Sequence, residues 1–117
     1  MTAKTTAHPL AMIFHLRGRL DSSNAAAVEE EVLGLLGEPR RHLVLDFSEL
    51  DYINSAGLRI LVLAYQRLHP QGKQLIICGA RDYIAEVFEI AGYNRIFAMH
   101  SDLDEAMRVI AAQSDGQ

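Results

Sequence analysis

Residues 42–68 read HLVLDFSELDYINSAGLRILVLAYQRL, and this stretch decides the fold. It begins with a short apolar strand at residues 43–45. A polar turn near Ser48 follows, and then a second brief apolar pair at residues 52–53. At residues 54–55 the apolar spacing changes, and a long apolar helix begins. The stretch therefore predicts a strand-to-helix junction with a serine at its tip.

The segments before this stretch predict one strand and one helix. Residues 12–17 alternate with a period of two, which indicates a strand with one firmly buried face. Residues 21–24, Asp-Ser-Ser-Asn, offer several helix N-caps. Behind them, the apolar residues of 25–36 fall on one face of a helix. Gly37 and Pro39 are expected to end it.

The segments after the stretch predict two more strands and two more helices, namely strand 74–78, helix 82–91, strand 96–99 and helix 103–110. Asp82 is the expected N-cap of the first of these helices, and Gly92 suits the left-handed position after it. Ser101 and Asp104 are spaced as a capping box for the second helix, with Asp in place of Glu.

The elements alternate as strand and helix four times. Such alternation with short connections calls for right-handed crossovers and a mostly parallel sheet. The strands at 43–45 and 74–78 are apolar throughout, as expected when helices cover both faces. We expect one α/β domain over residues 10–112, with a central sheet of four to five strands and about four helices. Residues 1–9 are either a tail or an edge strand, and residues 113–117 are a polar tail.

Composition excludes several classes of protein. Eleven Lys and Arg residues against fifteen Asp and Glu residues give a net charge of −4, which argues against nucleic-acid binding. The one cysteine, Cys78, lies in an apolar run and suits a buried thiol in a reducing compartment. No secretory signal is visible, and no segment approaches the roughly 20 apolar residues of a membrane span. We expect a cytoplasmic protein.

Catalytic chemistry finds little support. Ser55 stands where a hydrolase nucleophile would stand, but that elbow needs glycine two positions to either side, and Ile53 and Gly57 occupy those positions. No Cys or His pair has metal-ligand spacing, and no phosphate-binding glycine motif occurs. None of the histidines has an acidic partner at a recognisable spacing; they are His8, His15, His42, His69 and His100. We expect no enzyme, no metal and no cofactor.

Ser55 then has two interpretations. In the first, Asn54 or Ser55 simply caps the helix, since both are good N-cap residues. In the second, Ser55 is a regulatory hydroxyl. A phosphate on it would meet free backbone N–H groups and the positive end of the helix dipole, and would add about −1.5 to −2 charges.

The helix after Ser55 carries more apolar residues than one core face needs. Its core stripe is Leu58, Leu61, Val62, Tyr65 and Leu68. Ile60, Leu63 and Ala64 are apolar as well. The excess indicates either deep burial or a partner-binding patch near the helix start.

Residues 43–46 and 51–59 together resemble the signature of STAS domains, most closely that of bacterial anti-sigma factor antagonists. Residues 18–21, Gly-Arg-Leu-Asp, resemble the family's Gly-x-Leu-Asp segment, and residues 91–97 resemble its glycine-containing helix end. The likeness covers residues 12–110, and Asn-Ser-Ala-Gly-Leu is its most specific part.

The resemblance implies a STAS-like domain that binds an anti-sigma factor, usually a serine kinase of the histidine-kinase-like ATPase type. The unphosphorylated form binds this partner and frees the sigma factor. The kinase then phosphorylates the junction serine, here Ser55, the complex dissociates, and a phosphatase resets the switch. The implied partner-binding residues are Asp21, Ser22, Asn54, Ser55, Ala56, Gly57, Leu58 and Arg59.

Two positions depart from the family pattern. Many relatives have Asp where this chain has Asn54, and a second hydroxyl residue where it has Ala56. Ser55 is therefore the only hydroxyl at the junction. Two alternatives stay open: a STAS module of another assembly, such as a lipid-transport or sensory complex, without phosphorylation, and a small hydrolase that uses Ser55.

Overall fold

A five-stranded sheet organises the chain, and its strand order is the order of the sequence, β1-β2-β3-β4-β5. The computed structural model describes residues 2–36 and 41–115. The elements in chain order are β1 (Thr2–Ala7), β2 (Ala11–Leu20), α1 (Ala25–Leu35), β3 (His42–Ile53), α2 (Ser55–Leu68), β4 (Leu75–Cys78), α3 (Asp82–Ala91), β5 (Ala98–His100) and α4 (Leu103–Asp115). Short 3₁₀ turns follow α2 and α3.

The sheet is mostly parallel, as predicted. β2, β3, β4 and β5 pair in parallel, and β1 is antiparallel to β2. Of the two alternatives for residues 1–9, the edge strand is the one that the structure shows. The single α/β domain with four helices is also confirmed.

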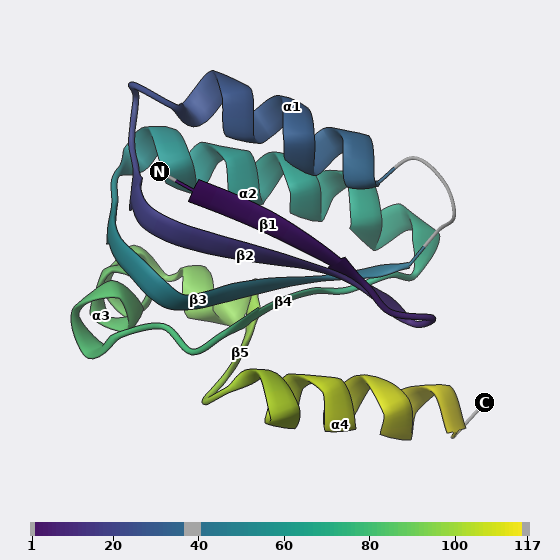
Figure 1. Cartoon of the computed structure of the whole chain (residues 1–117). Coiled ribbons are helices and arrows are strands. Elements are labelled where there is room, and N and C mark those ends of the chain that lie inside the picture. The colour runs from purple at the N-terminus through teal and green to yellow at the C-terminus, as the bar shows by residue number, and fades with distance from the viewer. Residues whose placement is uncertain (1, 37–40, 116–117) are drawn as a thin grey trace.

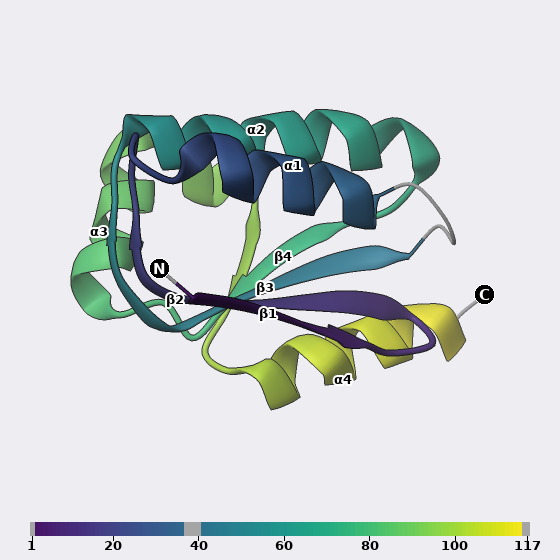
Figure 2. The ribbon, with the colours of Figure 1, turned by 45° about the horizontal axis from the view of Figure 1, so that its top comes forward.

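The helices cover the sheet unequally (Figures 1 and 2). Helices α1 and α2 lie side by side on one face, and α4 lies alone on the other. Helix α3 lies at the end of the sheet where α1 and α2 begin. The larger core cluster fills the space under α1, α2 and α3, and the smaller one lies beneath α4.

Strand β3 is longer than predicted. It runs without a break from His42 to Ile53, through the expected turn near Ser48. Two register irregularities in the β2–β3 pairing explain the error, because each places one extra β3 residue opposite β2. The buried positions there, Phe47, Leu50 and Ile53, are consequently three residues apart and do not follow a period of two.

Two other element ends differ from the predictions. The last strand is Ala98–His100, where 96–99 was predicted, because a 3₁₀ turn occupies Tyr93–Arg95 and Ile96 still has helical backbone angles. Helix α4 continues to Asp115, into the predicted tail at 113–117. Gly37 and Pro39, the predicted stop signals after α1, lie outside the described residues, as do residues 116–117.

Two predicted helix caps are also wrong by one residue. The N-cap of α3 is Arg81, and Asp82 is the first helical residue. At α4, the Glu105 N–H donates to Asp102 Oδ1 at 2.8 Å, so Asp102 caps the helix in place of Ser101. Gly92 does adopt the left-handed conformation, with φ of 79°.

The apolar excess of α2 belongs to the core. Ile60 and Ala64 are buried, because α2 packs against α1 as well as against the sheet. Leu63 is half-buried. Burial thus accounts for Ile60 and Ala64, and the idea that they form a partner patch is wrong.

Cys78 is buried in the cluster beneath α4, as predicted. Burial, and then the nearby carboxylates of Asp46 and Asp102, raise the pKa of its thiol to about 12. The thiol therefore stays protonated and unreactive at neutral pH.

Within residues 2–36 and 41–115, none of the helices combines the length and hydrophobicity that a bilayer crossing requires.

Candidate functional site

The candidate site lies at the edge of the sheet where the parallel strands end. The carboxyl ends of parallel strands meet at one edge, so the loop after β2 and the junction after β3 are neighbours there. A backbone hydrogen bond of 3.2 Å from Asn54 N–H to the Leu20 carbonyl ties them together. We call the exposed surface formed by Asp21, Ser22, Asn54, Ser55, Ala56 and Arg59 the docking edge.

Asn54, and not Ser55, caps helix α2. Its Oδ1 accepts hydrogen bonds from the N–H groups of Ala56 at 3.0 Å and Gly57 at 3.3 Å, and its carbonyl accepts from Leu58 N–H at 3.0 Å. The expectation that a phosphate on Ser55 would meet free N–H groups is therefore wrong for residues 56–58. These donors are already engaged.

Ser55 is the first residue of α2, and its side chain is exposed. Among the described residues, no partner forms a hydrogen bond with its hydroxyl. The cap is complete without it, so the hydroxyl has no structural role to give up if it is modified.

Gly57 and Leu58 support the docking edge from below and do not belong to its surface, since both are buried. A Cβ atom on Gly57 would lie 2.8 Å from the side chains of both Ile53 and Leu20. Only glycine lets the first turn of α2 approach the ends of β2 and β3 so closely. Of the predicted partner-binding residues, Ser22, Ser55 and Arg59 are exposed, and Asp21, Asn54 and Ala56 are half-buried.

Asp21 opens the loop between β2 and α1. Its carboxylate accepts hydrogen bonds from the hydroxyl and the N–H of Ser23, and with Arg19 these lower the pKa of Asp21 below its ordinary value. Asn24 closes the loop, since its Nδ2 donates to the Arg19 carbonyl at 2.7 Å and its Oδ1 accepts from Asp21 N–H. These hydrogen bonds hold the loop in shape, and the Asp21 carboxylate, which also pairs with Arg19, lies near the junction of β3 and α2.

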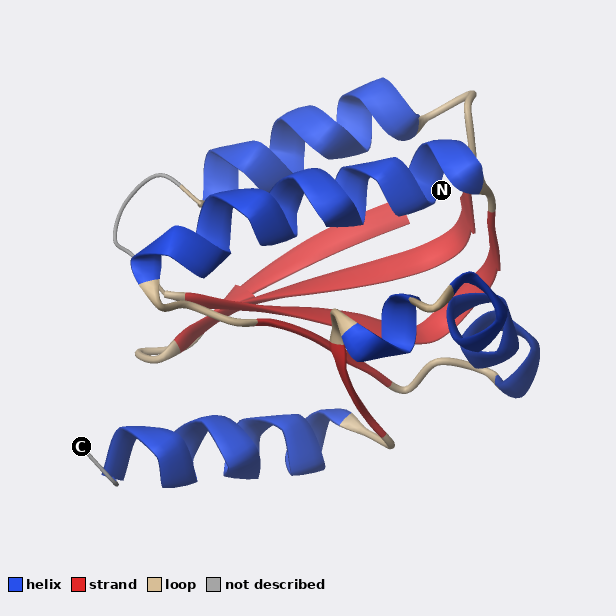
Figure 3. Cartoon of the chain, turned by 180° about the vertical axis from the view of Figure 1, so that it is seen from behind, coloured by secondary structure: helices blue, strands red, loops and turns tan. Residues whose placement is uncertain are grey.

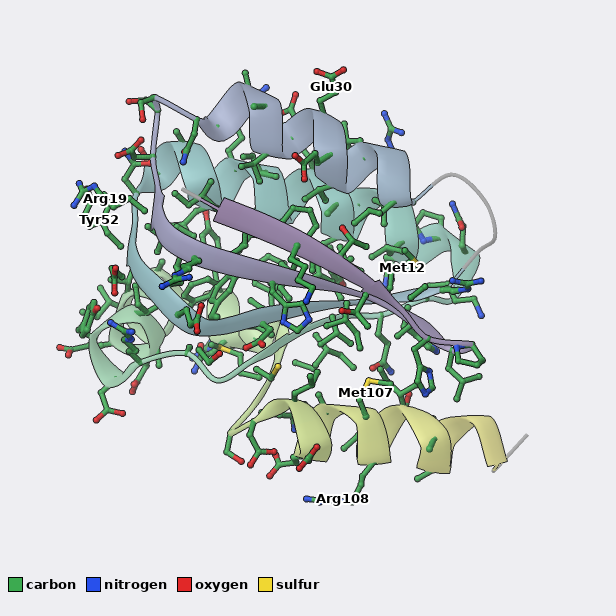
Figure 4. The ribbon with its side chains drawn as sticks, viewed as in Figure 1. Met12, Arg19, Glu30, Tyr52, Met107 and Arg108 are labelled. Carbon is green, nitrogen blue, oxygen red and sulfur yellow. The ribbon has the colours of Figure 1, made fainter. Side chains whose placement is uncertain are left out.

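Arg19 and Tyr52 are surface residues near this edge that sequence reasoning missed. The Arg19 guanidinium lies 4.1 Å from the centre of the Tyr52 ring, a cation–π contact between register partners of β2 and β3 (Figure 4). Arg81, at the start of α3, pairs with Asp51. The pairing of residues 19 and 52 depends on the two irregularities in register, and no sequence signal marks these.

Arg59 connects the docking edge to helix α1. Its guanidinium lies 3.6 Å from the carboxylate of Glu29 on α1, and its side chain is 72% exposed. An ion pair so open to water is weak and easily exchanged.

Two histidines have acidic partners, contrary to the prediction. His15 Nδ1 lies 2.8 Å from Asp46 Oδ2, and His100 Nδ1 lies 2.8 Å from Glu105 Oε1. The first pair joins neighbours across the sheet, 31 positions apart in sequence, so no local spacing reveals it. Burial alone would raise the pKa of Asp46. The hydrogen bonds that its carboxylate makes with Ser48 N–H and His15 outweigh this effect, so the pKa lies below its ordinary value.

The His15–Asp46 and His100–Glu105 pairs do not support a hydrolase that uses Ser55. His15 and Asp46 line a cavity of about 310 Å³ on the face that carries α4, whereas Ser55 begins a helix on the opposite face. Within residues 2–36 and 41–115, no histidine forms a hydrogen bond with Ser55, and no three His, Cys, Asp or Glu side chains gather as a metal site.

Comparison with known proteins gives consistent matches. The family model described as the STAS domain matches residues 2–106. BtrV of Bordetella bronchiseptica, which is named as an anti-sigma factor antagonist, is 36% identical over 95 residues, which cover 81% of this chain and 82% of that protein.

Solved structures show the same fold at low sequence identity. The anti-sigma factor antagonist SpoIIAA in its unphosphorylated form superposes with a TM-score of 0.83 at 14% identity, covering 95% of this chain and 97% of that one. The phosphorylated form of Bacillus SpoIIAA gives a TM-score of 0.74 at 14% identity, covering 93% and 99%. At such identities the likeness establishes the fold alone.

Proposed function

The chain belongs to the STAS domain family, and on that premise we propose that it is an anti-sigma factor antagonist, which binds an anti-sigma factor and so releases a sigma factor. The observation that carries this proposal is the 36% identity to BtrV over four-fifths of both chains. Because sigma factors act in the cytoplasm, the proposed function implies a cytoplasmic protein.

The partner we propose is an anti-sigma factor that is also a serine kinase of the histidine-kinase-like ATPase type. The docking edge supports this choice, because it joins a rigid acidic loop at Asp21 to an exposed hydroxyl at Ser55. A kinase that docks at this edge has the acceptor hydroxyl within the contact surface. Gly57 and Leu58 act indirectly, by holding the first turn of α2 in place.

Phosphorylation of Ser55 is the proposed off-switch. The hydroxyl is exposed and Asn54 alone provides the cap, so a phosphate does not disturb the helix start. It places about −1.5 to −2 charges in the middle of the docking edge, beside the ionised Asp21. Repulsion and bulk then separate the partners, and a phosphatase restores the binding form.

The test is a phosphorylation assay with mapping of the product. The protein is mixed with ATP and candidate anti-sigma kinases, and any phosphate is located by mass spectrometry. We expect one phosphate, on Ser55, and none on the Ser55→Ala variant. Stable binding without a phosphate would favour a STAS module of another assembly. Absence of binding to every anti-sigma factor would contradict the proposal.

A further inference from the structure

We propose that phosphorylation of Ser55 draws Arg59 away from Glu29, so that the ion pair between α1 and α2 opens as the switch is set. This inference rests on the proposed phosphorylation of Ser55 and concerns how the docking edge responds to it. It assigns to Arg59 the role of the cation that receives the phosphate.

The start of α2 is held closely against the ends of β2 and β3. Gly57 packs against Leu20 and Ile53 with no space for a Cβ atom, and Asn54 N–H is bonded to the Leu20 carbonyl. The N–H groups of residues 56–58 are already donated to Asn54. A phosphate on Ser55 therefore cannot use the N–H groups of residues 56–58, and a cationic side chain within reach would be its strongest partner.

Arg59 is the side chain in position to respond. Residues four apart on a helix are neighbours on its surface, so Arg59 lies one turn beyond Ser55 on the same side of α2. Its contact with Glu29 is 3.6 Å long, and the side chain is 72% exposed, so it can exchange partners. A guanidinium also binds phosphate through two parallel hydrogen bonds.

The competition favours the phosphate. It carries about twice the charge of a carboxylate, and its partner lies on the same helix at fixed spacing. Of the other arginines described near this edge, Arg19 contacts both the Tyr52 ring and Asp21, and Arg81 pairs with Asp51.

The exchange changes the surface of α1 as well as that of α2. Figure 3 shows the two helices side by side along their length. Once Arg59 turns to the phosphate, Glu29 joins Glu30 and Glu31 as a run of three carboxylates on α1, with Glu30 pointing away from the sheet (Figure 4). The negative charge of the phosphorylated form then extends from the junction to α1, beyond the reach of the phosphate itself.

The test uses protein that carries phosphoserine at position 55 by genetic incorporation, so that no kinase is needed. The second pKa of the phosphate is measured by ³¹P NMR in the parent and in Arg59→Gln. We expect a higher pKa in Arg59→Gln, because loss of a neighbouring cation disfavours the dianion. Arg67→Gln is the matched control, an exposed arginine on the same helix three turns away, and it should leave the phosphate pKa unchanged.

A second measurement follows Arg59 directly. In the unphosphorylated protein, Glu29→Gln should shift the Nε–H signal of Arg59, and in the phosphorylated protein it should not. Equal phosphate pKa values in the parent and Arg59→Gln, or an Arg59 signal that still responds to Glu29→Gln after phosphorylation, would overturn the inference. Neither result depends on a kinase or partner, so the proposed function stands or falls separately in the assay above.

Discussion

Asn54 and Ser55 are both good N-cap residue types, and in this protein only Asn54 caps the helix. The side-chain oxygen of Asn54 accepts hydrogen bonds from the N–H groups of Ala56 and Gly57. The Ser55 hydroxyl is exposed and forms no hydrogen bond within the described residues. A serine at the cap itself would hold its hydroxyl in hydrogen bonds to the first N–H groups of the helix. Placing the hydroxyl one residue into the helix separates stability from regulation.

At the residue scale, Gly57→Ala tests how tightly α2 is seated. The added methyl group would lie 2.8 Å from both Leu20 and Ile53. We expect a loss of about 1 to 3 kcal/mol in the free energy of unfolding, measured by urea denaturation. The control is Gly34→Ala on α1, where a Cβ atom meets nothing within 4 Å. That change should be neutral or should stabilise by up to about 1 kcal/mol. Equal effects at the two glycines would contradict the close packing.

At the element scale, the first half of strand β3 was predicted from the sequence and the second half was not. The helices were predictable, since their apolar spacing is local, and α3 begins within one residue of its predicted start. The second half of β3 was not, because its extra residues depend on how β2 lies beside it. The same is true of His15 and Asp46, whose contact requires the register between strands. Ser55 and Asp21 could be assigned to the site because both belong to a recognised pattern, whereas Arg19 and Tyr52 meet only after folding.

The start of β3 also gives a pH-dependent element. His42 Nδ1 accepts a hydrogen bond of 3.0 Å from Gln74 N–H, which ties β3 to the segment before β4. Burial, with the charge of Lys73, lowers the pKa of His42 below its ordinary 6.5. The unfolded chain therefore binds this proton more tightly than the folded protein does. This contribution to stability is complete above about pH 6.5 and is lost as the pH falls towards the folded-state pKa.

We expect the free energy of unfolding to decrease between pH 7.5 and pH 5.5, as measured by urea denaturation. The control is His42→Asn, whose side-chain oxygen can accept the same hydrogen bond but does not titrate. Its unfolding free energy should change less over this interval. The same pH dependence in both proteins would show that His42 is not responsible.

At the scale of the whole molecule, the docking edge lies at one end of the domain. Figure 1 places the start of α2 at the end opposite the C-terminus of α4. A negative charge added at the start of α2 should therefore affect partner binding, and the same charge added near the C-terminus of α4 should not.

Ser55→Glu should weaken binding to the anti-sigma factor by at least about tenfold, because burying an unpaired charge and a longer side chain at the centre of an interface costs affinity. Its free energy of unfolding should stay within about 0.5 kcal/mol of the parent, since Glu is favourable at a helix start. Ala112→Glu, exposed on α4, carries the same charge and should bind as the parent does. Calorimetric titration measures both. An unchanged affinity in Ser55→Glu would rule out a charge switch.

The order of the strands has a consequence for how the protein is made. Every strand pairs only with strands next to it in sequence, so each one leaving the ribosome meets a neighbour that is already in place. The segment up to Leu68 contains β1, β2 and β3 with α1, α2 and the whole docking edge. The docking edge is therefore synthesised before β4, α3, β5 and α4, and α4, the last element, covers the opposite face of the sheet.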